Sequence, residues 1–117
     1  MQGTLDPSTE GPVFTGAGMK LVLPRSIFDT EVTAPVEVEL GLRPESARLA
    51  EGTPHQSLTV EYTEPTGADL FVNGKAGGTA IVARLDRALK AEPGDTLPIQ
   101  WRLEDASVFE LSSGQRL

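Results

Sequence analysis

The chain has 117 residues, which is typical of one domain, and carries 10 Lys and Arg against 17 Asp and Glu, giving a net charge of −7. This balance argues against nucleic-acid binding, which depends on neutralising phosphates with basic side chains. The absence of cysteine excludes disulfides, thiolate zinc sites and a cysteine nucleophile. No apolar run approaches the ~18 residues of a membrane span, so we expect no direct insertion into a membrane.

The first dozen residues are rich in Gly, Pro, Ser and Thr, and we expect a flexible lead-in over residues 1–11. Beyond them, apolar residues alternate with polar ones at a period of two, which predicts half-buried strands. The clearest case puts Val36, Val38, Leu40 and Leu42 on one face. The predicted strands are Met19–Leu23, Val36–Arg43, Leu58–Tyr62, Ala68–Val72, Thr79–Leu85, Leu97–Leu103 and Val108–Leu111.

Turn residues separate these segments. Asn73-Gly74 is a preferred type I′ pair, which Lys75–Gly78 would extend into a longer hairpin loop. Pro65–Gly67 and Pro93–Asp95 predict two further turns. Only residues 84–91 have some helical character, and the preceding Ile81-Val82 favours a strand there. We therefore predict an all-β fold, an antiparallel barrel or sandwich with at most one short helix.

Catalytic side chains are scarce in this sequence. His55 is the only histidine and lies in a turn-like stretch, where we expect a solvated loop residue rather than a catalytic base. The carboxylates are scattered along strands, and Glu37 and Glu39 are typical of a solvated strand face rather than of a metal site. We expect no catalysis, no metal and no cofactor in this chain.

Phosphate-binding loops are also missing. Gly16-Ala17-Gly18 begins like a dinucleotide-binding fingerprint, but no helix follows it. Leu111–Gln115 resembles the LSGGQ sequence of ABC-type ATPases, which works at the start of a helix. Because this segment lies at the end of the chain, we expect only a tight turn after the last strand.

The segment Leu40-Gly41-Leu42-Arg43-Pro44-Glu45 resembles a Leu-Gly-Ile-Arg-Pro-Glu sequence in the C-terminal regulatory region of ABC importer ATP-binding subunits, the maltose and sn-glycerol-3-phosphate group. This region is the transport-associated OB, or TOBE, domain. The similarity spans roughly residues 2–117, with further matching segments at Pro12–Pro24, Leu58–Gly67, Pro93–Leu97 and Glu104–Phe109.

The resemblance implies an OB-fold-like antiparallel β-barrel with additional short strands, occupying residues 1–117 as one regulatory domain. The ATPase domain that bears the phosphate loop is absent from the chain. The implied partners are a second copy in a homodimer, that ATPase domain, the other transporter subunits and, in some members, a regulatory protein. The implied location is cytoplasmic, peripheral to the inner membrane through the transporter.

The residues that match the family segment are Gly41, Arg43, Pro44 and Glu45, which the resemblance places near regulatory and interdomain contacts. Pro44 fixes its own φ and biases Arg43 toward an extended backbone, which ends the strand sharply. Arg43 and Glu45 would then face either a partner or each other in a local ion pair. Ser46 departs from the family, where His is commoner after the Glu.

Two other functions remain open from the residues. One is a small-oxyanion binding module of the molybdate type, since Glu45–Leu49 resembles part of its Ser-Ala-Arg-Asn motif, although Leu49 stands in place of the Asn. The other is an OB-fold for single-stranded nucleic acid. That function needs a basic groove with aromatic platforms, and this acidic chain offers only Trp101, Tyr62 and four Phe.

Overall fold

A computed structural model describes all residues, 1–117. It contains ten strands and three short 3₁₀ helices, and none of its helices is long and apolar enough to cross a membrane. The strands are β1 (Gln2–Asp6), β2 (Val13–Gly16), β3 (Met19–Val22), β4 (Val36–Gly41), β5 (Ala47–Leu49), β6 (Gln56–Pro65), β7 (Asp69–Ala76), β8 (Thr79–Asp86), β9 (Thr96–Trp101) and β10 (Ser107–Glu110). The 3₁₀ helices are η1 (Arg25–Ile27), η2 (Pro44–Ser46) and η3 (Leu103–Asp105).

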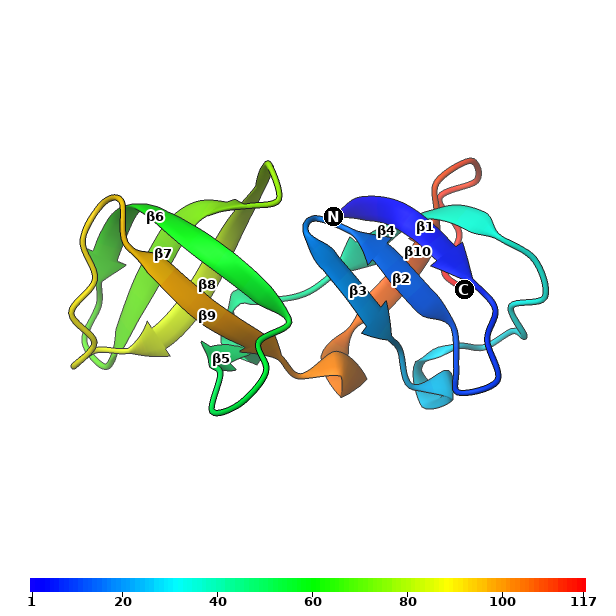
Figure 1. Cartoon of the computed structure of the whole chain (residues 1–117), viewed down its shortest axis with the longest axis horizontal. Helices are drawn as coiled ribbons and strands as arrows, with labels where there is room; N and C mark the ends of the chain where they lie inside the picture. The colour runs from blue at the N-terminus through cyan, green and yellow to red at the C-terminus, as the bar shows by residue number, and fades with distance from the viewer.

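Two five-stranded antiparallel sheets lie side by side along the long axis of a molecule measuring 43 × 24 × 23 Å (Figure 1). The first sheet has the order β10-β4-β1-β2-β3 and the second β5-β9-β6-β7-β8. The second sheet is a nearly closed barrel, because its edge strands β5 and β8 lie against each other. The predicted all-β, OB-like antiparallel fold is therefore confirmed.

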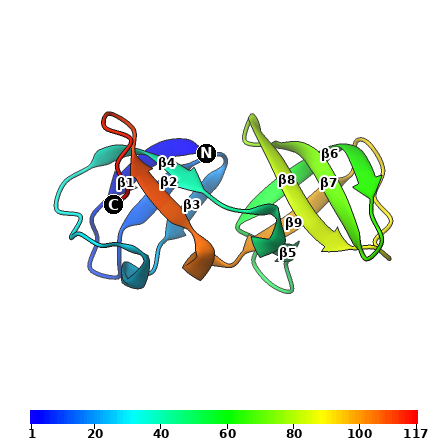
Figure 2. The ribbon, with the colours of Figure 1, turned by 180° about the vertical axis from the view of Figure 1, so that it is seen from behind.

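The chain crosses between the sheets twice (Figure 2). After β4 it passes through η2 into β5 of the second sheet, and after β9 it returns through η3 to β10 of the first. These two 3₁₀ turns explain why the strands predicted at 36–43 and 97–103 end early, at Gly41 and Trp101.

The expectation of a flexible lead-in over residues 1–11 is wrong for residues 2–6, because these form β1, the central strand of the first sheet, whereas residues 7–11 belong to no strand. Strand β1 pairs with β2 and β4, and its Leu5 is completely buried. The sequence of β1, Gln-Gly-Thr-Leu-Asp, carries one large apolar residue, too few for the alternation to show. Gly3 is needed in this strand because the ring of Phe14 occupies the space that a Cβ would fill.

The hairpin between β7 and β8 turns at Gly77-Gly78, so the prediction of a turn at Asn73-Gly74 is wrong. Both turn glycines have positive φ angles, +53° and +78°, as a two-residue type I′ turn requires. Asn73 and Gly74 instead lie within β7. Gly74 passes close to the Thr59 carbonyl, beside a β-bulge in β6, and a side chain at position 74 would collide with that carbonyl.

The stretch 84–91 is not helical, as the preceding residues indicated. Strand β8 continues through Asp86, whose side-chain oxygen then accepts a hydrogen bond from the Ala88 amide at 2.7 Å and whose carbonyl accepts one from Leu89 at 3.0 Å. The expected turn after the last strand is also present, at residues 111–113.

The apolar core is one continuous cluster of 21 buried residues with members in both sheets. Within it lies the amide of Gln56, which is 3% exposed. Its nitrogen donates to the Ala17 carbonyl at 2.8 Å, and its oxygen accepts from the Trp101 indole N–H at 2.9 Å. Because Gln56 and Trp101 belong to the second sheet and Ala17 to the β2–β3 turn of the first, this amide joins the two sheets.

We predict that Gln56→Leu lowers the free energy of unfolding by about 2–3 kcal/mol, since it leaves the Trp101 indole N–H and the Ala17 carbonyl buried without partners. Urea unfolding followed by fluorescence of Trp101, the only tryptophan, measures this change. The matched control is Gln115→Leu, at an exposed position, which should stay within about 0.5 kcal/mol of the parent. Equal stability of the two variants would contradict the assigned role.

Candidate functional site

The residues selected from the sequence lie where the chain crosses from the first sheet to the second. Gly41 ends β4 opposite Ser107, and Pro44 opens η2. Arg43 has φ −86° and ψ 151°, the extended backbone expected before a proline. The structure thus brings Arg43, Pro44 and Glu45 together on one exposed turn, with Gly41 two residues before it.

The charged side chains of this turn do not pair with each other. Arg43 and Glu45 are both exposed, and neither belongs to any of the ion pairs within 4.0 Å that the chain forms. The local ion pair considered from the sequence is therefore not formed. Both charges remain free at the surface, while Gly41 and Pro44 are half-buried.

Ser46 holds this turn against the returning segment. Its hydroxyl donates to the Asp105 carboxylate in η3 at 3.0 Å, its amide donates to the Arg43 carbonyl at 3.0 Å, and its carbonyl accepts from the Arg102 amide at 2.9 Å. Ser46 is only 6% exposed. The two crossing segments are therefore tied to each other, so the turn has a fixed backbone.

Sequence reasoning missed this connection between Ser46 and Asp105. The two residues are 59 positions apart, and neither carries a local pattern that indicates a long-range hydrogen bond. The only available signal was that Ser46 stands where the similar family more often has His.

The groups near Ser46 do not form an oxyanion site. The Ser46 hydroxyl is directed to a carboxylate, and the Ala47 amide is bonded to the Pro44 carbonyl. The adjacent hollow is lined by Arg48 and Arg102 together with Glu45 and Glu104, so its charges are mixed. Nothing in this geometry favours the oxyanion-binding alternative.

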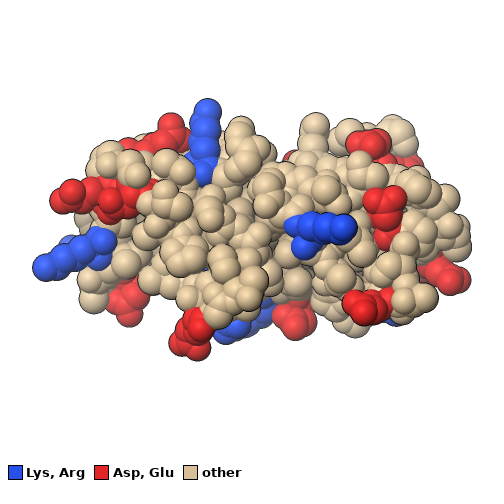
Figure 3. All heavy atoms as spheres, in the orientation of Figure 1, with Lys and Arg blue, Asp and Glu red and all other residues tan.

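The charged side chains form neither a basic surface for nucleic acid nor an acidic cluster for a metal ion. Acidic side chains are dispersed over the face shown in Figure 3, where basic ones are few and form no stripe. No three His, Asp or Glu side chains gather closely enough to hold a metal ion.

His55 is not the solvated loop residue that we expected. It is half-buried, its Nδ1 accepts a hydrogen bond from the Trp101 amide at 2.9 Å, and its own amide donates to the Ile99 carbonyl at 2.9 Å. Burial lowers the pKa of His55 from its ordinary 6.5, and the positive charge of Arg48 lowers it further. The neutral imidazole is thus an acceptor for the end of β9.

The lowered pKa of His55 predicts a pH-dependent stability. Below pH 6.5 the imidazole of His55 is protonated more readily in the unfolded chain than in the folded chain. The contribution of neutral His55 to the free energy of unfolding is therefore complete above that pH. The contribution is lost as the pH falls through 6.5 toward the folded value. Between about pH 7.5 and about pH 5.5, the parent should therefore lose more unfolding free energy than His55→Asn.

The His55→Asn control suits this test because the Asn oxygen can accept from the Trp101 amide but does not titrate in this range. Urea unfolding at the two pH values gives the comparison directly. If the parent and the variant lose the same stability, the hydrogen bond from Trp101 does not depend on a neutral imidazole.

Comparisons with known proteins agree with this architecture. The family model described as "TOBE domain" matches residues 40–109, a range that contains both crossing segments and the whole second sheet. The model match therefore covers more than half of the chain.

Several similar proteins carry the name sn-glycerol-3-phosphate import ATP-binding protein UgpC. That of Chromobacterium violaceum is 35% identical over 103 residues, covering 87% of this chain and 27% of the relative. That of Cupriavidus metallidurans is 37% identical over 86 residues, covering 71% and 23%. That of Paraburkholderia xenovorans is 32% identical over 113 residues, covering 93% and 31%. The chain thus spans less than a third of the length of these relatives, and it belongs to the TOBE domain family.

Proposed function

We propose that this chain is the regulatory and dimerisation domain of the ATP-binding subunit of an ABC importer for sn-glycerol-3-phosphate or a carbohydrate. The observation that carries the proposal is the TOBE match at residues 40–109, together with about 35% identity to UgpC proteins over most of the chain. In this proposal the chain is not catalytic, and ATP is bound and hydrolysed by another domain of the subunit. The subunit works at the cytoplasmic side of the inner membrane through its transporter complex.

In this proposal residues 1–117 act as a single unit. Three features support it: the apolar cluster is continuous across both sheets, Gln56 bonds to both of them, and the crossing segments are tied through Ser46 and Asp105. A domain with such connections moves as one body relative to its partners.

The turn at Arg43, Pro44 and Glu45 is the proposed contact with the ATPase domain, a second copy or a regulatory protein. Its two charged side chains are exposed and unpaired, and its backbone is fixed by Ser46. A rigid turn that presents a cation and an anion offers a partner two directional contacts with little conformational entropy to lose. Gly41 lies at the end of β4, two residues before this turn.

An exchange of domains tests the proposed role as a whole. A chimera of the Chromobacterium violaceum UgpC, in which this chain replaces the region similar to it, should retain ATP-dependent uptake of sn-glycerol-3-phosphate. The control is the same subunit with that region deleted. A chimera that folds and assembles, yet transports no better than the deleted subunit, would refute the proposal.

Removal of both charged side chains tests the proposed contact at the turn. The double substitution Arg43→Ala with Glu45→Ala should reduce coupled ATP hydrolysis by the chimera about tenfold, the effect of losing about 1.4 kcal/mol at an interface. Its unfolding free energy, measured on the isolated chain, should change by less than about 0.5 kcal/mol because both side chains are exposed.

A matched control exists for this double substitution. Lys90 and Glu92 have the same spacing, opposite charges and exposed positions, so Lys90→Ala with Glu92→Ala tests for a general charge effect. Equal rates of ATP hydrolysis by the two double variants would show that the turn is not part of the interface.

A further inference from the structure

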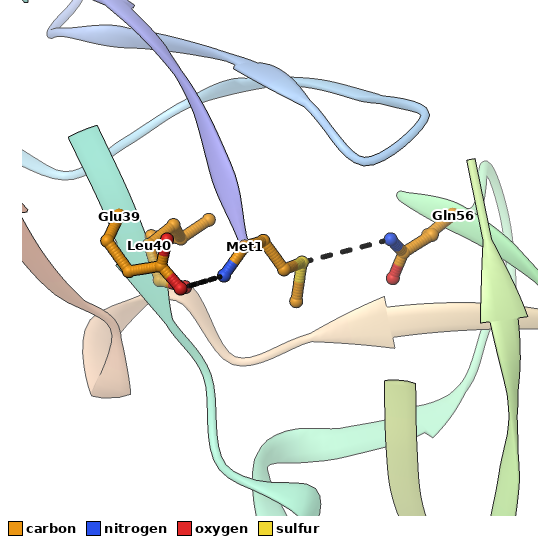
Figure 4. A network of polar contacts seen from close by, with 4 residues as sticks. All are labelled: Met1, Glu39, Leu40 and Gln56. Carbon is orange, nitrogen blue, oxygen red and sulfur yellow. Dashed lines mark hydrogen bonds and ion pairs between the residues drawn. The ribbon is translucent and has the colours of Figure 1, made fainter. Parts of the chain in front are cut away.

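The surface where the two sheets meet is occupied by residues of the chain itself. Met1 lies there, and its sulfur is 3.9 Å from the Gln56 amide nitrogen. Its own nitrogen donates to the Leu40 carbonyl at 2.7 Å and to the Glu39 carboxylate at 3.1 Å (Figure 4). An open surface lies elsewhere, on the outward face of β6, β7 and β8, opposite to the face that these strands turn to the core. Strands β7 and β8 face the viewer in Figure 2, and every residue that β8 directs outward between positions 80 and 86 is exposed.

Apolar side chains adjoin one another on this outward face. In the register of the strands, Asn73 pairs with Tyr62 on one side and with Val82 on the other, so these three residues form one row. Phe71 precedes Asn73 by two residues and therefore points to the same face. Tyr62 is 52% exposed and Val82 38% exposed, while Phe71 is half-buried. Adjoining exposed apolar side chains with charged groups around them are typical of a protein contact surface.

Charges of opposite sign lie at the two ends of this face. Lys75 is at one end, and the residues paired with it in β6 and β8 are uncharged. Asp69 is at the other end, where it pairs with Asp86. Glu64 and Arg84 lie in the row between, and the Arg84 guanidinium also reaches the Asp69 carboxylate at 3.9 Å. Three carboxylates and one guanidinium make this end acidic, whereas the Lys75 end of β7 is basic.

The signs are reversed along the β6 side of the face. The β-bulge in β6 places the exposed Glu61 next to Tyr62, toward the Lys75 end. Beyond the opposite end of β6, the Arg87 guanidinium donates to the Thr66 carbonyl at 3.0 Å. Each end of the face thus has one sign of charge along β7 and the other sign along β6.

This distribution of charge is complementary to itself under a two-fold rotation. When the axis lies in the plane of the face, perpendicular to β7 and opposite Val72, Lys75 of each copy meets Asp69 of the other. The same rotation sets Glu61 toward Arg87 and brings the apolar rows of the two copies together. An axis parallel to the strands would instead set Lys75 against Lys75 and Asp69 against Asp69, which is unfavourable because the charges are alike.

The area of this face indicates a weak contact. Three strands ~4.8 Å apart, with about seven residues each at ~3.4 Å, cover roughly 350 Å² per copy. A stable pair of proteins buries about 800 Å² per partner. We therefore expect the isolated chain to be in equilibrium between monomer and dimer.

We propose that two copies of this chain associate through the outward face of β6, β7 and β8, with Lys75 of each copy against Asp69 of the other. The inference rests on the proposed function, which includes dimerisation, and it names the surface responsible. It assigns the second copy to this sheet face, so the turn at Arg43, Pro44 and Glu45 is left to the ATPase domain or a regulatory protein.

The apolar centre of the face is tested by placing a charge in it. Sedimentation equilibrium of the full chain gives the dissociation constant of the dimer. Tyr62→Glu should raise this constant about tenfold or more, because the carboxylate would be buried against the second copy. The matched control Leu111→Glu changes an apolar residue that is also exposed, at 45%, but lies in the turn after β10. The control should leave the constant unchanged, and equal effects of the two substitutions would overturn the inference.

The charged ends of the face are tested by exchanging their signs. Lys75→Glu and Asp69→Lys should each raise the dissociation constant about tenfold or more, since each sets like charges against each other. In an equimolar mixture the two variants form a mixed dimer in which both pairs again have opposite charges. Association should then return to within about threefold of the parent. Failure of the mixture to associate, while both variants unfold in urea as the parent does, would overturn the arrangement.

Failure of this contact can be distinguished from failure of the importer assignment. If the chain stays monomeric at about 1 mM, a concentration at which even a weak dimer forms, the inference and the dimerisation role are both refuted, whereas the UgpC chimera can still transport. If the mixed variants associate but the chimera transports no better than the deleted subunit, the contact surface stands and only the importer assignment is refuted.

Discussion

The arrangement of the two sheets depends on a polar group placed inside an apolar core. The amide of Gln56 has both its donor and its acceptor sides occupied by groups that are themselves buried, so water cannot replace either bond. Sliding one sheet over the other would break the bond to Ala17 and leave an unpaired polar atom in the core. Apolar contacts tolerate small shifts, whereas a bond at 2.8 Å does not, and it therefore fixes the position of one sheet on the other.

The close approach of the β2–β3 and β7–β8 hairpins, which both contain glycine, depends on the same position of one sheet relative to the other. The Cα of Gly77 lies where a side chain on Gly18 would contact it at 3.3 Å, and a side chain on Gly77 would collide with Gly18. The β2–β3 turn that supplies the carbonyl of Ala17 is thus also the turn that meets the β7–β8 hairpin. Small residues at both tips let the backbones come near enough for Gln56 to reach across.

Sequence reasoning predicted the class of this fold because five of the ten strands, β4 and β6 to β9, alternate over five residues or more. It failed where the signal was not local. Strand β1 contains one buried leucine, and β5 has only three residues, so neither shows a period. The sequence predicted the turn at Asn73-Gly74 instead of Gly77-Gly78. A glycine that is needed because a neighbouring strand passes close by, such as Gly74, cannot be distinguished by sequence from a glycine that is needed for a turn.

The candidate site shows the same division between local and distant information. The backbone of Arg43 followed from the proline after it, since that effect is steric and local. The roles of Ser46, Gln56 and His55 all depend on residues more than 35 positions away. A family resemblance selected Arg43 and Glu45, but only the structure shows that their charges are unpaired.

The exposed turn at Arg43, Pro44 and Glu45 is connected to both sheets through the segments on either side of it. Arg43 and Glu45 belong to the connection from β4 to β5, and Ser46 attaches that connection to η3, which leads into β10. A partner bound at this turn therefore contacts a point linked by covalent chain to one strand of each sheet and by a hydrogen bond to the returning segment. Because Gln56 prevents the sheets from shifting independently, displacement of the turn moves the domain as a whole.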